Sequence, residues 1–343
     1  MKTISFYLPQ FHDEILNEQF WEKGFSDWTT SQKMKPLYKG HIQPKIPRDG
    51  CYDLLNINVM KHQCELAKSI GIDGFSFYYY QFDEELSALR KPLLNYINSD
   101  IDFPFCITWA NHSWSKAWIG DSKTVIAEQL FDACTVDKFL SDLDCYTEKP
   151  NYIKWNDKYF VSILYPTNLD IVNLKRKFRE AYGKELYVIS LVHQNGVDLV
   201  ISWPPGDLNF HKLQRFGGLR YMLKKFSKIV GLRKIAFRYT NLVSEKSLLE
   251  RQSYETNNNP TVAQTILTGW DNTPRYKLDG YVVTPTTPEN YVAMVRKILS
   301  KNRSNGHPVS FIKAWNEWAE GNVIEEKGND INYGEAISDA LDN

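Results

Sequence analysis

The sequence lacks a net charge and lacks cysteines at paired spacings. Its 343 residues carry 41 Lys and Arg against 41 Asp and Glu, so no whole-molecule field would draw it to nucleic acid or to an acidic membrane. Any recognition must therefore come from a local site. The five cysteines are an odd number without a CxxC pair, which argues against a disulfide framework and against a zinc site. We expect free, mostly buried thiols at Cys51, Cys64, Cys106, Cys134 and Cys145.

Long apolar runs and targeting signals are also missing. No window approaches the run of about 18 apolar residues that a membrane-spanning helix needs. The first residues, MKTISFYLPQFH, contain neither an apolar signal core nor a small-residue cleavage site. No internal repeat, low-complexity tract or interdomain linker is visible, so residues 1–343 are expected to form a single domain. We expect a cytoplasmic protein without a transmembrane segment.

What the sequence does contain is a regular alternation of strand-like and helix-like patterns. Helical spacing of apolar residues separates most of the strand-like runs, most clearly at 58–71, 136–143, 169–184 and 288–302. Continuous apolar strands joined by helices indicate a parallel sheet covered on its outer face, and eight of them close a (β/α)8 TIM barrel. The eight runs are TISFYLPQF, GFSFYYYQ, FPFCITWAN, YFVSILYPT, LYVISLVHQ, DLVISWPP, TILTGWDN and SFIKAWNEW.

An open doubly wound sheet is the rival architecture. It is disfavoured because the first strand is followed by YLPQFH, where such a fold carries a glycine-rich phosphate loop. The fifth and sixth strands are joined by little more than NGV, which is too short for a helix. We therefore expect a barrel that is irregular around strands 5 and 6.

Polar and aromatic residues gather at the carboxyl ends of the strand-like runs. In a barrel all of these ends meet on one face, where active sites form. Aromatic residues make up 14% of the chain, with 10 Trp and 20 Tyr, a content suited to flat, hydroxyl-rich ligands. We expect one pocket lined by these strand ends, namely Gln10, Tyr80, Trp109, Asn111, Tyr165, His193, Gln194, Trp203, Trp270, Asp271 and the stretch from Trp315 to Glu320.

The stretch AWNEWAEG places Glu317 and Glu320 three residues apart. On a helical turn such positions are neighbours, with Cβ atoms about 5–6 Å apart. Two acids in one partly dry site push their pKa values apart, which supplies the acid and the base that glycoside cleavage needs. Trp315 and Trp318 would offer apolar faces for sugar stacking, and Asn316 a contact to a hydroxyl. The competing interpretation is a helix N-terminus, where acids are stabilised by the helix dipole.

Further candidates for sugar contact lie near the first strand and in the segment that follows it. His12 and His41 could bind sugar hydroxyls or could satisfy backbone groups. Tyr7 and Trp28 could be stacking platforms or packing residues at the barrel mouth. No His, Asp and Glu cluster has the spacing of metal ligands, so neither a metal nor another cofactor is expected.

Residues 211–238 form a basic segment, with nine Lys or Arg and no acid. A basic amphipathic stretch of this kind can bind a membrane surface or a polyanion. A solvated helical face is the simpler interpretation, and it is the one that the sequence favours.

Eight motifs are distributed along the chain: YLPQFH, FWEKGFSDWT, KPLYKGHIQPKIP, YDL, GIDGFSFYYY, FPFCITWAN, WDNTPR and AWNEWAEG. Together they resemble the glycoside hydrolase family 99-like proteins of the WbsX type, relatives of endo-acting α-mannosidases that often accompany bacterial surface-polysaccharide genes. The resemblance spans nearly the whole chain and implies a (β/α)8 barrel with its carboxylate pair at Glu317 and Glu320. It also implies that Glu317 deprotonates the sugar 2-hydroxyl, giving a 1,2-anhydro sugar, while Glu320 protonates the leaving oxygen.

Several positions depart from the usual pattern of that family. Tyr79 stands at a usual His, Ser202 at a usual acid and Gly206 at another usual His, and the WAN motif continues with His112 and Ser113. Because these positions are expected to line the pocket, the binding shell is expected to differ while the carboxylate pair is kept.

The function that the resemblance favours is a retaining glycoside hydrolase or transglycosidase. Its substrate would be an α-linked, mannoside-like bacterial surface polysaccharide or a precursor of one. Two alternatives stay open: a glycosyltransferase of O-antigen or capsule biosynthesis, and a catalytically weak glycan-binding assembly protein. No motif supports nucleic-acid binding.

Overall fold

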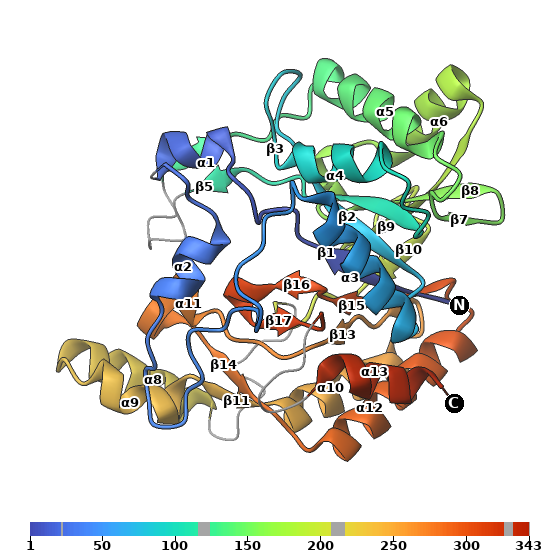
Figure 1. Ribbon diagram of the computed structural model, residues 1–343. Coiled ribbons are helices and arrows are strands. Elements are labelled where there is room, and N and C mark those ends of the chain that lie inside the picture. The colour runs from blue at the N-terminus through green and yellow to red at the C-terminus, as the bar shows by residue number, and fades with distance from the viewer. Residues whose placement is uncertain (22, 116–123, 207–216, 326–331, 343) are drawn as a thin grey trace.

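The computed structural model describes residues 1–343 except Glu22, 116–123, 207–216, 326–331 and Asn343. A curved sheet lies at the centre, and helices cover its outer face (Figure 1). The hydrogen-bonded order is β12-β10-β9-β8-β4-β2-β1-β15-β13, with parallel pairing throughout. These strands are β1 (Lys2–Tyr7), β2 (Gly74–Gln81), β4 (Phe105–Trp109), β8 (Lys158–Ile163), β9 (Glu185–Ser190), β10 (Leu199–Ile201), β12 (Val262–Ala263), β13 (Ile266–Leu267) and β15 (Val309–Lys313).

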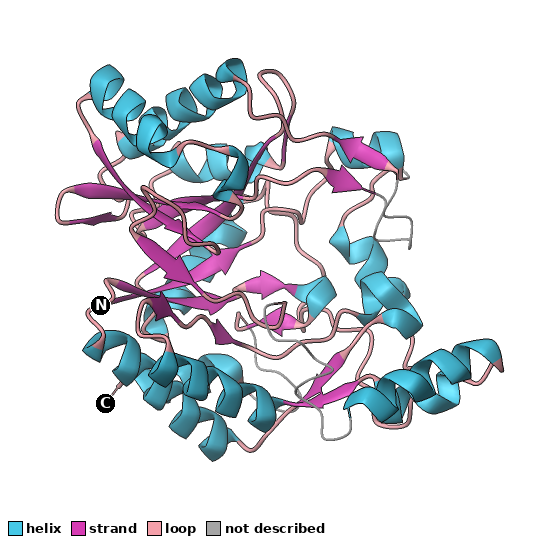
Figure 2. Cartoon of the chain, turned by 180° about the vertical axis from the view of Figure 1, so that it is seen from behind, coloured by secondary structure: helices cyan, strands magenta, loops and turns pink. Residues whose placement is uncertain are grey.

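Each of the eight expected runs contains one of these strands, so the prediction of eight parallel strand segments is confirmed. The short segment 262–267 contacts both ends of the strand path, because β12 pairs with β10 while β13 pairs with β15. Between them, the Thr265 backbone N–H donates to the Ser202 hydroxyl over 2.9 Å. The curvature of the sheet thus brings β10 and β15 to the two sides of one segment, which gives a (β/α)8-like arrangement. Figure 2 shows the strands grouped together with helices outside them.

The helices that cover the sheet overlap the helical patterns of the sequence and begin within three residues of them. The four clearest patterns form α3 (Ile57–Ser69), α5 (Ala133–Thr147), α6 (Ile171–Tyr182) and α12 (Pro288–Ser304), as predicted. Each of the four follows an Asn, Asp or Thr whose side chain accepts a hydrogen bond from the first helical turn. The outer layer is completed by α4 (Arg90–Ile97), α10 (Glu245–Asn258) and α13 (Tyr333–Leu341).

The connection between β9 and β10 has no helix, which confirms the expected irregularity. Residues 191–198 are all described and form only bends and a turn. Gly196 has φ +89°, and a Cβ at this position would lie 2.9 Å from the Val172 backbone nitrogen. Glycine therefore fits both the left-handed backbone and the close approach of α6.

Strand alternation divides the aromatic residues into an inner and an outer layer. Tyr7 on β1 faces outward, since its hydroxyl donates to Gln63 on α3 over 2.5 Å. Its neighbour Phe6 faces the inside of the curved sheet, where its ring stacks on Phe311 with centroids 4.7 Å apart. The inner layer thus carries the side chains that can reach the carboxyl-end face.

The five cysteines are free, as the sequence predicts. Cys64 and Cys106 are buried, whereas Cys51, Cys134 and Cys145 are exposed. The expectation of mostly buried thiols is therefore wrong. Two of the exposed cysteines lie on α5, whose core side is filled by larger residues such as Phe139 and Leu143.

Several short elements lie outside the main strand path. Near the carboxyl ends of β13 and β15 are α2 (Asp27–Lys33), β11 (Leu242–Ser244), α11 (Thr273–Tyr276), η3 (Lys277–Asp279), β14 (Val282–Thr284), β16 (Asn316–Glu317), η4 (Trp318–Glu320) and β17 (Asn322–Val323). The others are α1 (Ile15–Phe20), β3 (Ser87–Ala88), β5 (Trp114–Ser115), β6 (Val125–Ala127), β7 (Lys154–Trp155), η2 (Pro166–Asn168), α8 (Gly217–Ile229) and α9 (Arg233–Thr240). Within the described residues, no helix is both long enough and apolar enough to cross a membrane.

Candidate active site

Glu317 and Glu320 lie on one turn shortly after β15 ends. Glu317 closes β16 and immediately precedes the 3₁₀ turn η4, which contains Glu320. Because a 3₁₀ turn has three residues, positions three apart lie above one another. Gly321 ends the turn with φ +67°, and a Cβ there would lie 2.8 Å from the Asp271 backbone nitrogen. This glycine lets the carboxylate turn approach the loop that carries Asp271.

Arg275 on α11 joins Glu320 to a second buried acid, Asp27 on α2. Its Nη1 lies 2.7 Å from Glu320 Oε1, and its Nη2 lies 2.8 Å from Asp27 Oδ2. Burial raises the pKa of Asp27, and the Arg275 charge only partly offsets that effect. Burial alone would lower the pKa of Arg275, yet the charges of Asp27 and Glu320 hold it above its ordinary value. Glu320 is therefore an ion-pair partner of Arg275.

Glu317 is the more buried acid of the pair, with 6% of its surface exposed. Burial and the nearby charge of Glu320 raise the pKa of Glu317 to about 7, against the opposing effects of Arg275 and Lys313. Two acids that interact this closely titrate as a unit. The pair can therefore hold one proton near neutral pH, which is a requirement of acid–base chemistry.

Lys313, the last residue of β15, connects Glu317 with two tryptophans of the inner layer. Its side chain is almost fully buried, at 4% exposure. The ammonium lies 4.2 Å from the ring centre of Trp203 and 5.2 Å from that of Trp270, which are cation–π distances. Lys313 was not among the expected site residues. Its signal in the sequence is a lone lysine inside the apolar run SFIKAW.

Tyr78 and Tyr80 face Glu317 from the inner side of β2. Burial raises the pKa of both hydroxyls, and the charge of Glu317 is the next cause in each case. The Tyr78 hydroxyl is buried beside the Glu317 carboxylate, which is its hydrogen-bonding neighbour. Tyr80 was expected here, whereas Tyr78 was overlooked. The two-residue period of a strand would have placed them on the same face.

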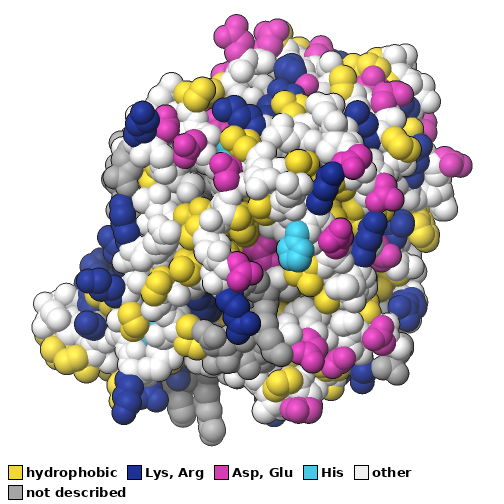
Figure 3. Space-filling model, in the orientation of Figure 1, with side chains coloured by type: hydrophobic (Ala, Val, Ile, Leu, Met, Phe, Trp, Pro, Cys, Tyr) yellow, Lys and Arg dark blue, Asp and Glu magenta, His cyan; other side chains and the backbone are white. Residues whose placement is uncertain are grey.

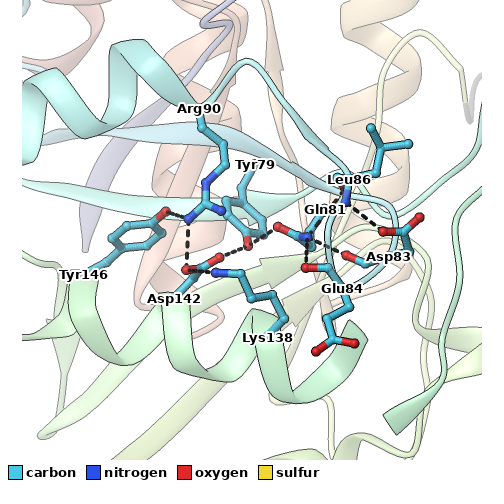
Figure 4. Close-up of polar contacts among 9 residues, drawn as sticks. All are labelled: Tyr79, Gln81, Asp83, Glu84, Leu86, Arg90, Lys138, Asp142 and Tyr146. Atoms are coloured by element: carbon cyan, nitrogen blue, oxygen red, sulfur yellow. Dashed lines mark hydrogen bonds and ion pairs between the residues drawn. The ribbon is translucent and has the colours of Figure 1, made fainter. Parts of the chain in front are cut away.

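Tyr79 points from β2 toward Asp142 on α5, as Figure 4 shows. Its hydroxyl donates to Asp142 on α5 over 2.7 Å, and the same carboxylate is paired with Arg90 and Lys138. The expectation that Tyr79 lines the pocket is therefore corrected, because strand alternation turns it toward the helix layer.

Two polar side chains are buried just past the end of β1. Gln10 is 2% exposed, and its Nε2 has no hydrogen-bond partner among the described residues. His12 is 3% exposed, with Nε2 at 3.5 Å from the Glu14 carboxylate. A buried amide donor without a partner is costly unless a ligand or a water satisfies it, so Gln10 remains a good candidate for sugar contact.

Three residues expected to contact sugar face outward instead and pack against the helices. Trp109 is fully buried, and its ring stacks on Phe139 of α5 at 4.2 Å. Trp315 is also fully buried, with its ring 5.1 Å from Phe75 in the layer that contains Tyr7. The proposed contacts of Trp109 and Trp315 with sugar are therefore corrected to packing roles, and of the two interpretations of Tyr7 the structure favours packing.

Two expected amides anchor the backbone. Asn316 accepts from the Leu8 N–H over 2.8 Å and donates to the Leu8 carbonyl over 3.0 Å, which fixes the carboxylate turn to the end of β1. Asn111 makes the matching pair of bonds to Tyr165, at 2.9 and 2.7 Å. Each amide thus uses one acceptor and one donor to hold the backbone, and its contact with sugar stays a prediction.

Trp28 and Trp318 lie together beside the carboxylate turn, with ring centres 6.0 Å apart. The Trp28 indole N–H donates to the Tyr52 carbonyl over 2.8 Å, and the Trp318 indole N–H donates to Glu325. Both side chains are buried. They mainly support the turn, although Trp318 also lines the neighbouring cavity.

A cavity of about 880 Å³ lies next to the carboxylate turn and contains four expected residues in its wall: His41, Trp270, Asp271 and Trp318. Asp271 is fully buried and accepts from His41 Nε2 at 2.9 Å and from Gln43 Nε2 at 2.7 Å. Its backbone N–H donates to the Glu320 carbonyl over 2.6 Å. Asp271 thus links the cavity wall to the carboxylate turn, while neither glutamate lines the cavity itself.

The polar groups of the site are carboxylates paired with side-chain cations. Within the described ranges, no three His, Cys, Asp or Glu side chains lie close enough to hold a metal ion. The positive charges that act on Glu317 are those of Arg275 and Lys313. The chemistry that the described residues can perform is proton transfer between carboxylates and a bound ligand.

Comparison with known families and proteins places the chain among carbohydrate-related proteins. The model of the family described as Glycosyltransferase WbsX matches residues 3–337. The chain is similar to the protein WxcX of Xanthomonas campestris pv. campestris strain B100, with 29% identity over 340 residues that cover 94% of this chain and 47% of WxcX. The chain thus spans about half the length of the curated relatives it matches.

Two solved structures share the fold at low sequence identity. A glycoside hydrolase-like protein superposes with a TM-score of 0.60 at 15% identity, covering 99% of this chain and 92% of that protein. The GH99 endo-α-mannosidase from Bacteroides thetaiotaomicron gives a TM-score of 0.56 at 13% identity, covering 99% of this chain and 96% of the mannosidase. These similarities establish the (β/α)8-like architecture.

Proposed function

The chain belongs to the WbsX glycosyltransferase family, and from that membership and the geometry of its carboxylates we propose that it is a carbohydrate-active enzyme. Its substrate is an α-linked, mannoside-like sugar of a bacterial surface polysaccharide or of a precursor. Its reaction retains the configuration of the sugar and ends in hydrolysis or in transfer to another hydroxyl. The observation that carries the proposal is the burial of Glu317 on one turn with Glu320, which raises the pKa of Glu317 to about 7.

Glu317 acts as the base and Glu320 as the acid in the proposed reaction. Glu317 takes the proton of the sugar 2-hydroxyl, O2 forms a bond to C1, and the bond from C1 to the leaving oxygen breaks. Glu320 gives its proton to that oxygen. Water or an acceptor hydroxyl then opens the 1,2-anhydro ring at C1, its proton passes to Glu320, and O2 regains a proton from Glu317. Two displacements at C1 retain the configuration.

Sugar binding would change which carboxylate of the Glu317 and Glu320 pair is ionised. In the absence of sugar, burial favours the proton on Glu317, while Arg275 pairs with Glu320. A sugar hydroxyl that donates to Glu317 would stabilise its ionised form. The ionised Glu317 is then the base of the proposed reaction, and Glu320 is the acid that faces the leaving oxygen. A base with a pKa near the working pH is also the one that acts most effectively.

The residues around the pair would orient the sugar. Trp203 and Trp270 offer the aromatic faces that lie beside Lys313. Gln10 offers a buried amide donor without a partner in the described chain, and Tyr78 offers a buried hydroxyl beside Glu317. In the proposed enzyme residues 1–343 form one domain, a complete (β/α)8 barrel in which residues 262–267 fill the wall between β10 and β15.

Transfer rather than hydrolysis is the second candidate, and the family description favours it. Both outcomes share the first half of the reaction and differ only in the hydroxyl that opens the anhydro ring. A glycan-binding protein without turnover is the remaining alternative.

The test is incubation of the chain with α-mannosyl oligosaccharides and with aryl α-mannosides, with and without acceptor sugars, followed by product identification and NMR of the anomeric proton. Retained configuration and loss of turnover in Glu317→Gln are expected. The matched control is Glu289→Gln, which alters an exposed acid on α12 and should leave turnover unchanged. Inverted product, or equal turnover in Glu317→Gln, would contradict the proposal.

A further inference from the structure

Helices α8 and α9 form a hairpin at one edge of the molecule. They are joined at Gly231, which has φ +73°, and Figure 1 shows the pair projecting from the body at the lower left. The hairpin, residues 217–240, contains most of the basic segment that the sequence analysis interpreted as a solvated helical face.

The apolar stripe of α8 faces solvent. A surface helix normally turns such a stripe toward the core and its charges toward water. Here the apolar residues recur at helical spacing along one side of α8 and just past its end, and all are exposed. They are Leu219 at 58%, Met222 at 68%, Leu223 at 44%, Phe226 at 61%, Ile229 at 83% and Val230 at 43%.

The polar stripe of the same helix faces the body. Arg220 donates to the Leu242 carbonyl over 3.2 Å, and Lys224 donates to the Asp279 carbonyl over 3.4 Å. The Lys224 ammonium also lies 4.3 Å from the ring centre of Tyr281. These polar contacts fix the orientation of α8 against the body. The apolar stripe is therefore held on the outward side of the helix.

Helix α9 extends the apolar surface and holds the hairpin in place. Ile235 is 71% exposed and Tyr239 is 65% exposed, one helical turn apart. Phe237 is 1% exposed, with its ring 5.9 Å from that of Tyr38, and Arg233 pairs with Asp279. The buried Phe237 and this ion pair attach α9 to the body while the two apolar residues stay outside.

The charge of the hairpin indicates what covers this apolar surface. Residues 217–240 contain seven Lys or Arg and no Asp or Glu. Figure 3 shows Lys and Arg side chains beside hydrophobic ones at this lower-left edge of the molecule. Apolar residues flanked by cations are the composition of helices that lie in a membrane interface.

We propose that the α8–α9 hairpin docks on an anionic membrane surface, with its apolar stripe among the lipid chains and its exposed Lys225, Lys228 and Lys234 at the headgroups. The exposed apolar residues supply the area that the lipid chains would cover. A second copy of the chain is disfavoured as the occupant, because it would oppose the exposed Lys225, Lys228 and Lys234 with the same three cations.

Docking of the hairpin would bring the cavity beside the active site close to the lipid surface. Arg238 on α9 and Leu242 just after it both line the 880 Å³ cavity. A substrate held in the membrane could thus enter from the docked side. The docking itself does not depend on the proposed catalytic chemistry, so each can fail without the other.

The first experiment is sedimentation of the full chain with vesicles of phosphatidylcholine alone or mixed with an equal amount of phosphatidylglycerol. Binding to the mixed vesicles, weaker binding to phosphatidylcholine, and partial release by salt are expected. Absence of binding to the mixed vesicles, or equal binding to both kinds, would overturn the proposal.

The second experiment changes the apolar stripe without touching a buried group. Phe226→Ser combined with Ile229→Ser should lower the vesicle partition coefficient at least about tenfold. The matched control is Ile15→Ser combined with Val125→Ser, which alters residues of 62% and 54% exposure on other elements and should leave binding unchanged. Equal losses in both variants would overturn the proposal.

The third experiment tests the charges and the competing occupant. Lys225→Glu combined with Lys228→Glu should lower the partition coefficient at least about twentyfold, while Lys91→Glu combined with Lys297→Glu should change it little. The molar mass in solution should be that of a monomer for the parent chain and for the Phe226 and Ile229 variant. A dimer that this variant dissociates would assign the stripe to a second copy and overturn the proposal.

Discussion

Arg275 contacts Glu320 over 2.7 Å, although 45 positions separate the two residues in the sequence. The contact brings the WDNTPR segment to the carboxylate turn. Around it the site contains three acids, Asp27, Glu317 and Glu320, against the two cations Arg275 and Lys313. One proton on the carboxylate pair makes this group neutral. Burial and this excess of acids together raise the pKa of Glu317.

The first prediction concerns the stability contribution of Arg275. Replacing Arg275 with Met leaves Asp27 and Glu320 without their cation, and Asp27 is fully buried. The free energy of unfolding should fall by about 3–5 kcal/mol, the usual cost of removing one partner of a buried ion pair. Denaturant unfolding of the parent chain and the variant measures this difference in free energy.

Arg176 supplies the matched control for Arg275. It pairs with Glu180 on the surface of α6, with both side chains more than half exposed. Arg176→Met should change the free energy of unfolding by no more than about 0.5 kcal/mol. Similar losses in the two variants would show that Arg275 is not a buried charge partner.

The second prediction concerns the pH dependence of stability. The folded-state pKa of Glu317 is about 7, above its ordinary value of 4.5. Its proton therefore stabilises the folded state fully below about pH 4.5, and this stabilisation is lost as the pH rises through 7. The loss should be about 3 kcal/mol. Glu317→Gln cannot ionise, so the stability difference between it and the parent chain should grow in the variant's favour across this range. A constant difference would contradict the raised pKa.

The third prediction separates the roles of the two glutamates by leaving group. Glu320→Gln should lower kcat/KM by about 10²–10⁴-fold on sugar leaving groups, which need protonation, and much less on activated aryl glycosides. Glu317→Gln should remove turnover of both substrates, because the base acts on the sugar itself. Steady-state kinetics on the two substrate classes measure the effect. The reverse pattern would exchange the assignments.

The fourth prediction concerns Lys313, whose charge lowers the pKa of Glu317. Lys313→Met should raise that pKa, so the acidic limb of the kcat/KM profile should move to higher pH. Lys297→Met, on the exposed side of α12, is the control and should leave the limb in place. An unmoved limb in Lys313→Met would mean that Lys313 serves only to pack Trp203 and Trp270.

Among the site residues, the sequence predicted the turn of the two glutamates correctly but not the direction of several aromatic side chains. Glu317 and Glu320 were expected on one turn, and the structure places both at η4. Tyr7, Trp109 and Trp315 were expected to contact sugar, yet they pack under the helices. The sequence around an aromatic residue at a strand end does not show which face of the sheet its side chain occupies. A shift of the strand by one residue would move every side chain to the opposite face.

The sequence by itself determined the eight parallel strand segments, the four main helices and the turn of the two glutamates, because apolar periodicity and short spacings act locally. Only the tertiary structure decided that Arg275, Lys313 and Tyr78 surround Glu317, and that the apolar stripe of α8 faces outward. These arrangements depend on burial and on charges that meet from distant segments. No local pattern of residues contains that information.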